Sequence, residues 1–401
     1  MALRGRVFPL GGGMNEAMLG EIRKFVAPEF IFGADARLLA GRYARKLGGH
    51  RILLISDPGV LAAGWTGEVA ACLEQEGLTV TQFLGVSPNP RDTEVMEGAA
   101  LFREAGCDLI VAVGGGSVID CAKGVGIVAA NGGSILEFEG VDQVPAPMAP
   151  LICIPTTGGT SADVSQFAII THTQERVKIA IISKAVVPDV ALIDPRTLLT
   201  MDAYLTACTG MDAMVHAIEA FVSNAHSPIT DLHALEAIRL VSTHLRASTA
   251  APADLELRTQ IMLASLQAGL AFSNASLGSV HAMAHSLGGY MDLAHGECNA
   301  LLLPHVMDFN FSTAPDRYRR IAEAMGCNLR GLNEREGRSR ILRHVLDLRR
   351  DCGIDEGLTA RGVRSDDLSR LASKAILDPC NATNPRPPSR DDLRALYAEA
   401  M

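Results

Sequence analysis

The sequence has neither an excess of basic residues nor a basic run. Lys and Arg number 36 against 45 Asp and Glu, so the formal net charge is −9 at pH 7. Proteins that bind nucleic acid or anionic membranes neutralise phosphates with clustered Lys and Arg, so this balance argues against both partners. No apolar run is long enough to span a bilayer, and the first residues lack the apolar core of a signal peptide.

Paired cysteines are also missing. The nine cysteines are scattered between residues 72 and 380, their number is odd, and none forms a C-x-x-C pair. This pattern fits a reduced compartment better than a disulfide scaffold. We therefore expect a cytoplasmic protein.

The length and composition favour a large folded protein with a packed core. The 401 residues are 48% hydrophobic and 20% charged, which is enough for two domains with substantial cores. Short apolar or β-branched runs alternate with helical patterns in the first half, which predicts a parallel sheet covered by helices on both faces. The expected strands are residues 29–33, 51–57, 79–84, 108–113, 151–155 and 190–194, with a hairpin at 166–171 and 178–182.

Strand patterns end near Asp194-Pro195, and long helical patterns follow at 202–224, 229–248 and 253–276. We therefore predict an α/β domain over residues 1–195 and an all-helical domain over residues 196–401. Residues 1–28 are expected to form an N-terminal extension with a short amphipathic helix.

A glycine turn marks the candidate cofactor site. The motif G-G-G-S-V-I-D runs from Gly114 to Asp120, directly after a predicted strand and before a predicted helix. Glycines allow close approach of a pyrophosphate, and a helix N-terminus offers free N–H groups to it. Asp57 closes another strand and could accept hydrogen bonds from an adenosine ribose, which would disfavour a 2′-phosphate. The structural alternative for Asp57 is a helix N-cap before Pro58.

Three further polar residues accompany this turn. Thr156 and Thr157 follow a predicted strand and offer hydroxyls beside two glycines, unless they belong to an ordinary polar turn. Lys178 lies in an apolar stretch and could reach a phosphate or ribose. A lysine that snorkels to solvent is the equal alternative.

The candidate metal site lies in the second half. Asp212 and His216 are four residues apart on an apolar helix, and His281 and His285 repeat that spacing. Such pairs share one helix face, where a buried carboxylate needs compensation. His295 follows in a predicted turn. A carboxylate and imidazoles of this kind form a plausible ligand set for a divalent transition metal, although a helix N-terminus could also compensate Asp212.

Several motifs in a fixed order resemble one known family. They are S-D at 56–57, P-N-P at 88–90, G-G-G-S-x-x-D-x-A-K at 114–123, P-T-T-x-G-T at 155–160, G-M-D-A-x-x-H-A-x-E at 210–219, and H-x-M-A-H-x-L-G with H-G between 281 and 296. Together they resemble the iron-dependent (group III, iron-containing) alcohol dehydrogenases, over nearly the whole chain from about residue 29. One departure is the segment Gly158–Asp163, where the family more often has A-G-T-G-S-E after P-T-T, and this leaves the substrate class open.

The resemblance implies roles for individual residues. It places Asp212, His216, His281 and His295 on metal-ligand positions, and His285 on a histidine that lines the site without binding the metal. The implied cofactor contacts, to which the motif residue Asp120 is added, are Asp57, Asn89, Gly115, Gly116, Ser117, Asp120, Thr156, Thr157, Ser165, Phe167 and Lys178. The implied fold is that of dehydroquinate synthase and the iron-containing alcohol dehydrogenases: a Rossmann-like domain followed by an all-α domain.

The resemblance also implies the reaction. It is hydride transfer between NAD(H) and a small alcohol or aldehyde, with NADP less favoured because of Asp57. Fe²⁺ is the expected metal, Zn²⁺ being possible with these ligands, and His285 is the expected proton relay. The alternatives are a zinc-dependent polyol dehydrogenase of the glycerol type, a reductase of a small anionic aldehyde, a lyase related to dehydroquinate synthase, and a non-catalytic NAD-binding protein. A homodimer or higher homo-oligomer is expected.

Overall fold

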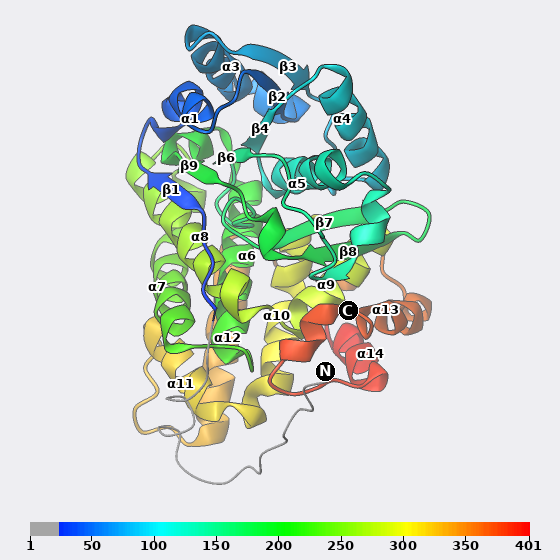
Figure 1. Cartoon of the computed structure of the whole chain (residues 1–401). Helices are drawn as coiled ribbons and strands as arrows, with labels where there is room; N and C mark the ends of the chain where they lie inside the picture. The colour runs from blue at the N-terminus through cyan, green and yellow to red at the C-terminus, as the bar shows by residue number, and fades with distance from the viewer. Residues whose placement is uncertain (1–23) are drawn as a thin grey trace.

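The structure is a computed structural model that describes residues 24–401. Most of the predicted N-terminal extension, with its amphipathic helix, lies outside the described residues. Within them, every strand ends by Ile193, and only helices and loops follow (Figure 1). This order confirms the predicted fold class, an α/β part followed by an all-helical part.

The α/β part is built on six parallel strands in the order β1-β9-β6-β4-β2-β3. All six strands expected outside the hairpin are present, and the order places β6, β4 and β2 side by side. Their bounds are β1 (Glu29–Phe32), β2 (Arg51–Ile55), β3 (Thr79–Phe83), β4 (Leu109–Gly114), β6 (Leu151–Pro155) and β9 (Val190–Ile193).

Helices cover both faces of this sheet because its central strands are apolar on both sides. In β2, Ile52 and Leu54 belong to a core under α1 (Ala40–Lys46) and α3 (Trp65–Gln75). Leu53 and Ile55 face the opposite core, under α4 (Asp92–Glu104) and α5 (Gly116–Asn131). The short helix α2 (Pro58–Ala62) follows β2.

The predicted hairpin is confirmed as β7 (Phe167–His172) and β8 (Val177–Ile182), which pair antiparallel. It does not join the large sheet. With β5 (Gly140–Val141) it forms a three-stranded sheet of its own, which lies between the parallel sheet and the helical part (Figure 1). One of its strands therefore carries residues into the space between the two parts.

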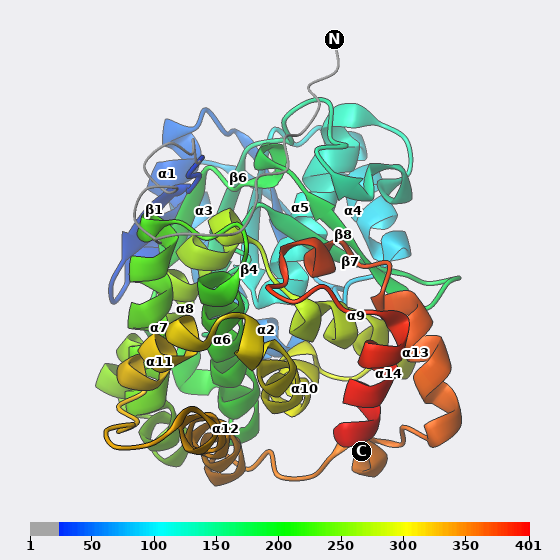
Figure 2. The same ribbon diagram turned by 90° about the horizontal axis from the view of Figure 1, so that it is seen from below.

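The helical part begins with the three long predicted helices. These are α6 (Ala203–Val222), α7 (Pro228–Ala250) and α8 (Leu255–Ala275). The remaining helices are α9 (Ser279–Met291), α10 (His295–Asn310), α11 (Pro315–Ala324), α12 (Glu334–Asp351), α13 (Leu368–Ala375) and α14 (Arg390–Glu399). The view from below shows the other helices around α6 and α10 (Figure 2). None of the helices in residues 24–401 has the length and apolar character needed to cross a bilayer.

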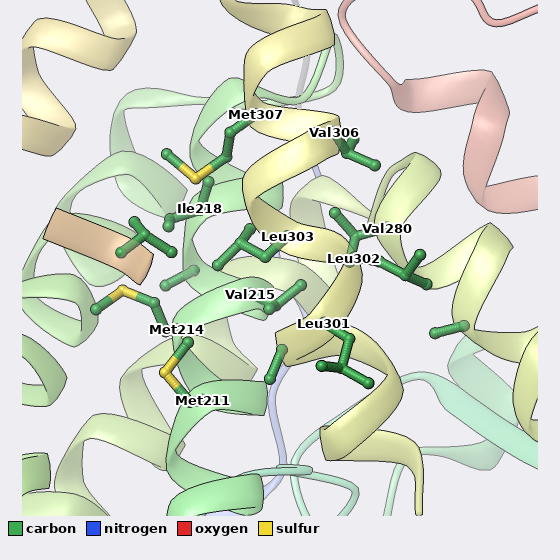
Figure 3. Packing of buried hydrophobic residues seen from close by; sticks show 14 of the residues in the cluster. Met211, Met214, Val215, Ile218, Val280, Leu301, Leu302, Leu303, Val306 and Met307 are labelled. Carbon is green, nitrogen blue, oxygen red and sulfur yellow. The ribbon is translucent and has the colours of Figure 1, made fainter. Parts of the chain in front are cut away.

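Helix α6 is the central helix of this part. It begins at the N-cap Asp202, whose carboxylate accepts from the Leu205 N–H at 2.7 Å, and every residue from Thr206 to Val222 is buried. Figure 3 shows Val215 and Ile218 packed beside Leu303 and Met307 of α10. Because the helix is enclosed on all sides, each polar side chain on it must find a partner inside the protein.

Candidate active site

One cavity collects most of the predicted site residues from both parts of the chain. It lies between the end of the parallel sheet, the hairpin and helices α6, α9 and α10. The predicted residues on its wall are Asn89, Gly116, Ser117, Asp120, Ser165, Phe167, Lys178, Asp212, His216, His281, His285 and His295. Asp57, Gly115, Thr156 and Thr157 do not line it.

Asp212, His216, His281 and His295 come together at one end of the cavity. The Asp212 Oδ1 lies 3.9 Å from Nε2 of both His281 and His295, and the rings of His216 and His281 stack with centroids 4.6 Å apart. Donor atoms roughly 3.5 Å apart are what bonds of about 2.1 Å to one ion require. His295 is not in a turn, as predicted, but is the first residue of α10, directly after the Ala294 N-cap.

Two of these imidazoles are fixed by buried acceptors at Nδ1. His216 Nδ1 lies 3.2 Å from the Gly159 carbonyl oxygen, and His281 Nδ1 lies 2.6 Å from Glu219 Oε2. A carbonyl can only accept, so the His216 proton is on Nδ1 and Nε2 keeps its lone pair. Neighbouring acceptors of this kind orient metal-ligating histidines. Burial lowers the pKa of His281 well below its usual value, which also keeps that ring neutral.

The approach of Gly159 to α6 depends on its lack of a side chain. A Cβ on Gly159 would lie 2.2 Å from the Thr209 carbonyl oxygen of α6. This loop is part of Gly158–Asp163, the segment that departs from the usual family motif. Its backbone therefore connects the α/β part directly to a histidine of the metal cluster.

Asn299 provides the test of whether a cation fits. Its Nδ2 donates to Asp212 Oδ1 at 2.6 Å and lies 3.1 and 3.2 Å from Nε2 of His281 and His295. Three acceptor atoms thus converge on one positively polarised group, which is the arrangement that a divalent metal would also satisfy. The buried Asn299 Oδ1 and His295 Nδ1 have no hydrogen-bond partner among the described residues. We conclude that the donor set fits a metal.

His285 lies beside the cluster with a different partner. Its ring stacks on His295 at a centroid distance of 5.4 Å, while its Nδ1 donates to Asp378 Oδ2 at 2.8 Å. Asp378 comes from the loop after α13. This arrangement leaves Nε2 of His285 as the nitrogen that is free to exchange a proton in the cavity.

Next to the cavity, beyond Gly116 and Ser117, lie the adjacent carboxyl ends of β2, β4 and β6, where nucleotides bind in parallel α/β sheets. Gly115 is the N-cap of α5, and the glycine turn lies between β4 and α5 as predicted. A Cβ on Gly115 would lie 2.9 Å from Thr157 Cγ2, and one on Gly116 would lie 2.8 Å from Thr160 Oγ1. The two glycines therefore let Thr157 and Thr160 pack directly against the start of α5, whose free N–H groups could bind a pyrophosphate.

Asp57 occupies the same edge but has the structural role that the sequence left open. It is the N-cap of α2 and accepts from the Val60 N–H through Oδ1 at 2.9 Å. Strand β2 ends at Ile55, two residues earlier than predicted, because the chain turns into this cap. Thr157 Oγ1 is buried without a partner among the described residues, so a hydroxyl is available at the end of β6.

Lys178 belongs to a polar network and does not snorkel to solvent. It is 8% exposed, and its Nζ donates to Asn89 Oδ1 at 2.6 Å. The Asn89 N–H in turn donates to Ser117 Oγ at 3.3 Å. Burial lowers the pKa of Lys178 and raises the pKa of nearby Asp120 to about 6. These contacts join β8, the P-N-P turn and the start of α5.

Three residues of the site were not assigned roles from the sequence: Glu219, Asn299 and Asp378. Glu219 shares the helix face of Asp212 and His216, seven and three residues after them, so a continued count along the helix would have found it. Asn299 is four residues after His295, a spacing that was hidden because His295 was placed in a turn. Asp378 carries no local signal.

The comparisons with known proteins agree with this geometry. Residues 27–195 match the iron-containing alcohol dehydrogenase family, and residues 206–401 match the C-terminal part of the Fe-containing alcohol dehydrogenase family. The chain is 40% identical over 373 residues to a 1,3-propanediol dehydrogenase of Klebsiella pneumoniae, covering 92% of this chain and 96% of that one. The chain belongs to the iron-containing alcohol dehydrogenase family.

Two further relatives support the assignment. An NAD-dependent methanol dehydrogenase of Bacillus methanolicus is 36% identical over 94% of this chain and 99% of its own length. A crystal structure of 1,3-propanediol oxidoreductase superposes with a TM-score of 0.92 at 38% identity, covering 95% of this chain and all of that chain. Both relatives therefore align with almost the whole chain.

Family membership confirms the predicted function class. The protein is a metal-dependent oxidoreductase of small alcohols, and the zinc-dependent polyol alternative is not favoured. A lyase acting on a phosphate-bearing substrate would need several cations, whereas the described cavity wall has Lys178 as its single Lys or Arg. The relatives at 40% and 36% identity are dehydrogenases, which disfavours a protein that only binds NAD.

Proposed function

We propose that this chain catalyses the reversible NAD-dependent oxidation of a short-chain alcohol to an aldehyde or ketone, with Fe²⁺ as its resident metal. The observation that carries this proposal is the convergence of Asp212, His281 and His295 on the Asn299 amide, with His216 stacked alongside. Asp212, His216, His281 and His295 are the proposed ligands. When bound, Fe²⁺ supplies Lewis-acid polarisation of the substrate oxygen and NAD⁺ accepts the hydride.

The chain itself supplies the proton path. His285, whose Nδ1 is held by Asp378, has Nε2 free to accept the alcohol proton as the carbonyl forms. Its position next to His295 places this base beside the proposed metal site. We therefore assign His285 as the catalytic proton acceptor and Asp378 as the residue that orients it.

The apolar wall of the cavity favours small, weakly polar substrates. Phe272 stacks on His216 with centroids 4.3 Å apart and meets Phe167 edge to face, and Leu277 and Ile169 also line the space. These side chains exclude water from the reacting carbon. The named substrates of the relatives, 1,3-propanediol and methanol, are of the corresponding size.

The cofactor contacts proposed from the sequence divide into two groups. Gly115, Gly116, Ser117 and Thr157 bound the start of α5, where the pyrophosphate would bind, while Asn89, Asp120, Ser165, Phe167 and Lys178 surround the route toward the metal cluster. Thr156 belongs to the first region, since its N–H donates to the Gly114 carbonyl at 3.0 Å. Asp57 at the end of β2 favours NAD over NADP through repulsion of a 2′-phosphate.

Three wider proposals complete this assignment. We divide the chain into a dinucleotide domain to residue 195 and a metal domain from residue 196, and we propose a cytoplasmic location. We also propose a homodimer or higher homo-oligomer. Strand β1 supports this, because it pairs with β9 on one side and has no strand on its other side among the described residues.

The test is NADH absorbance with protein reconstituted anaerobically with Fe²⁺ across a panel of alcohols and aldehydes. We expect turnover with short diols and primary alcohols, preference for NAD⁺ over NADP⁺, and higher activity with Fe²⁺ than with Zn²⁺. A protein that bound NAD but showed no hydride transfer with any metal would contradict the proposal.

A further inference from the structure

A second group of metal-binding side chains lies behind the catalytic histidine. His285, Asp378 and Cys380 each offer one donor atom, and these three atoms all lie within 4.8 Å of one another. His285 and Asp378 also line a second cavity, which opens between the hairpin and α13 and adjoins the first cavity at Lys178 and His285. A cation could therefore approach His285 and Asp378 from the side opposite Asp212, with the buried Cys380 thiol behind them.

The group is pre-arranged by the backbone. Asp378 is the N-cap of the 3-10 turn Pro379–Thr383, and its Oδ1 accepts from the Cys380 N–H at 2.8 Å. Its other oxygen accepts from His285 Nδ1 at 2.8 Å, and the Cys380 thiol is buried within 4.8 Å of both donor atoms. The carboxylate thus fixes His285 and the backbone of Cys380 at the place where a cation would bind.

We infer that His285, Asp378 and Cys380 form an inhibitory site for a thiophilic divalent cation such as Zn²⁺ or Co²⁺. A thiolate, an imidazole and a carboxylate suit these ions. The ligands proposed for Fe²⁺ include no sulfur, since they are Asp212, His216, His281 and His295. This inference rests on the proposed function for its effect on catalysis, but not for the binding itself.

The binding step balances as follows. The cation forms bonds to His285 Nδ1, Asp378 Oδ2 and Cys380 Sγ, the thiol proton leaves to solvent, and the His285 proton moves from Nδ1 to Nε2. With Nε2 protonated, His285 can no longer accept the alcohol proton in the first cavity. Occupation of the second site therefore lowers turnover by about a hundredfold, as loss of a general base does, while the iron stays in place.

Cobalt makes this site visible in the iron-loaded enzyme. Titration of the anaerobic holoenzyme with Co²⁺ should produce a thiolate-to-cobalt absorption band in the near ultraviolet that saturates at one equivalent, with the iron content unchanged by elemental analysis. Cys380→Ser and Cys380→Ala should both lose the band. Cys298→Ser is the matched control, because Cys298 is a buried thiol one helical turn from His295, beside the first site.

Zinc inhibition measures the consequence. Relative to its own zinc-free rate, Cys380→Ala should need at least about a hundredfold more Zn²⁺ for half inhibition, since lost support around a metal already costs tenfold to a hundredfold in affinity. The inference is overturned if no band appears, if the band survives in both Cys380 variants, or if it grows only as iron is lost. A normal band in a protein without dehydrogenase activity would retain the site and reject the proposed function instead.

Discussion

The two walls of the active-site cavity are built in different ways. The helical wall presents titratable side chains, and several are held by a second residue: His281 by Glu219, His285 by Asp378, and Asp212 by Asn299. The α/β wall combines the Lys178–Asn89 pair with hydroxyls and with the close-packed glycines Gly115 and Gly116 at the start of α5. The helical wall depends on buried partners, whereas the start of α5 depends on the absence of side chains.

Because the two walls are built differently, substitutions in them should impair different functions. Removing a partner on the helical wall should weaken metal binding or proton transfer even where the partner touches neither metal nor substrate. Adding atoms on the α/β wall should block the dinucleotide while leaving the metal in place. The predictions below separate these two kinds of failure, beginning with the largest effect.

The largest effect is expected on the helical wall, from His281→Ala. Loss of this proposed ligand should empty the site of metal and lower turnover by about a thousandfold or more, because a Lewis acid contributes several kcal/mol to the barrier. His285→Ala is the matched variant from the same helix face. It should retain full metal by elemental analysis and lose about a hundredfold or more in turnover. Full metal and full activity in both variants would refute the assignment.

On the α/β wall, Gly116→Ala should act on the dinucleotide alone. The new Cβ would lie 2.8 Å from Thr160 Oγ1, so Thr160 or the start of α5 must shift into the cofactor space. We expect about a hundredfold lower kcat/KM for NAD, the size of effect that misplacement by about 1 Å produces, with unchanged metal content.

Gly67→Ala is the control for that variant. It is also a helical glycine, but a Cβ there would meet no atom within 4 Å. It should leave the KM for NAD unchanged and stabilise the protein slightly, because alanine favours the helix by roughly 1 kcal/mol over glycine. If Gly116→Ala bound NAD as well as Gly67→Ala does, the N-terminus of α5 would not be the pyrophosphate-binding site.

Glu219→Gln tests whether a residue that only orients a proposed ligand also supports metal binding. Burial raises the pKa of Glu219 to about 7, and its carboxylate accepts from both His281 Nδ1 and the Val280 N–H. Glutamine keeps the shape but weakens the orientation of His281, so metal affinity should fall tenfold to a hundredfold, measured as the rate of metal loss to a chelator. Asp378→Asn should instead keep the metal and slow turnover. Equal rates of metal loss in Glu219→Gln and the unaltered protein would count against this role.

The same contrast explains what could be predicted from the sequence. The elements followed from local patterns: the glycine turn after β4 and the i, i+4 pairs on α6 and α9 were sufficient to place both walls. The partners did not follow, because Asp378 is 93 residues from His285 and Asn299 is 87 residues from Asp212. Pairings at such separations are created by tertiary packing, and no local periodicity reports them. Glu219 is the exception, since it shares a helix face with His216.

Lys123 is a buried partner that lies behind the α/β wall and does not line the cavity. Its side chain is fully buried, and Nζ donates to the carbonyl oxygens of Ser165 at 2.9 Å and Phe167 at 2.7 Å. These bonds fix the start of β7, which lines the cavity, onto helix α5. Lys123→Met should therefore raise the KM for NAD by about tenfold, equivalent to about 1.4 kcal/mol, in addition to lowering the melting temperature.

Arg258→Met separates the positional effect of Lys123 from its effect on stability. Arg258 is likewise fully buried and donates to Met201 and Pro252 carbonyl oxygens and to Thr206 Oγ1, but it lies on α8 and does not line the cavity. Both substitutions leave buried acceptors without donors, so both should destabilise the fold. Only Lys123→Met should change the KM for NAD at temperatures where both variants are folded. If the two variants lost stability alike and bound NAD alike, Lys123 would be a structural residue without a role in positioning the cofactor site.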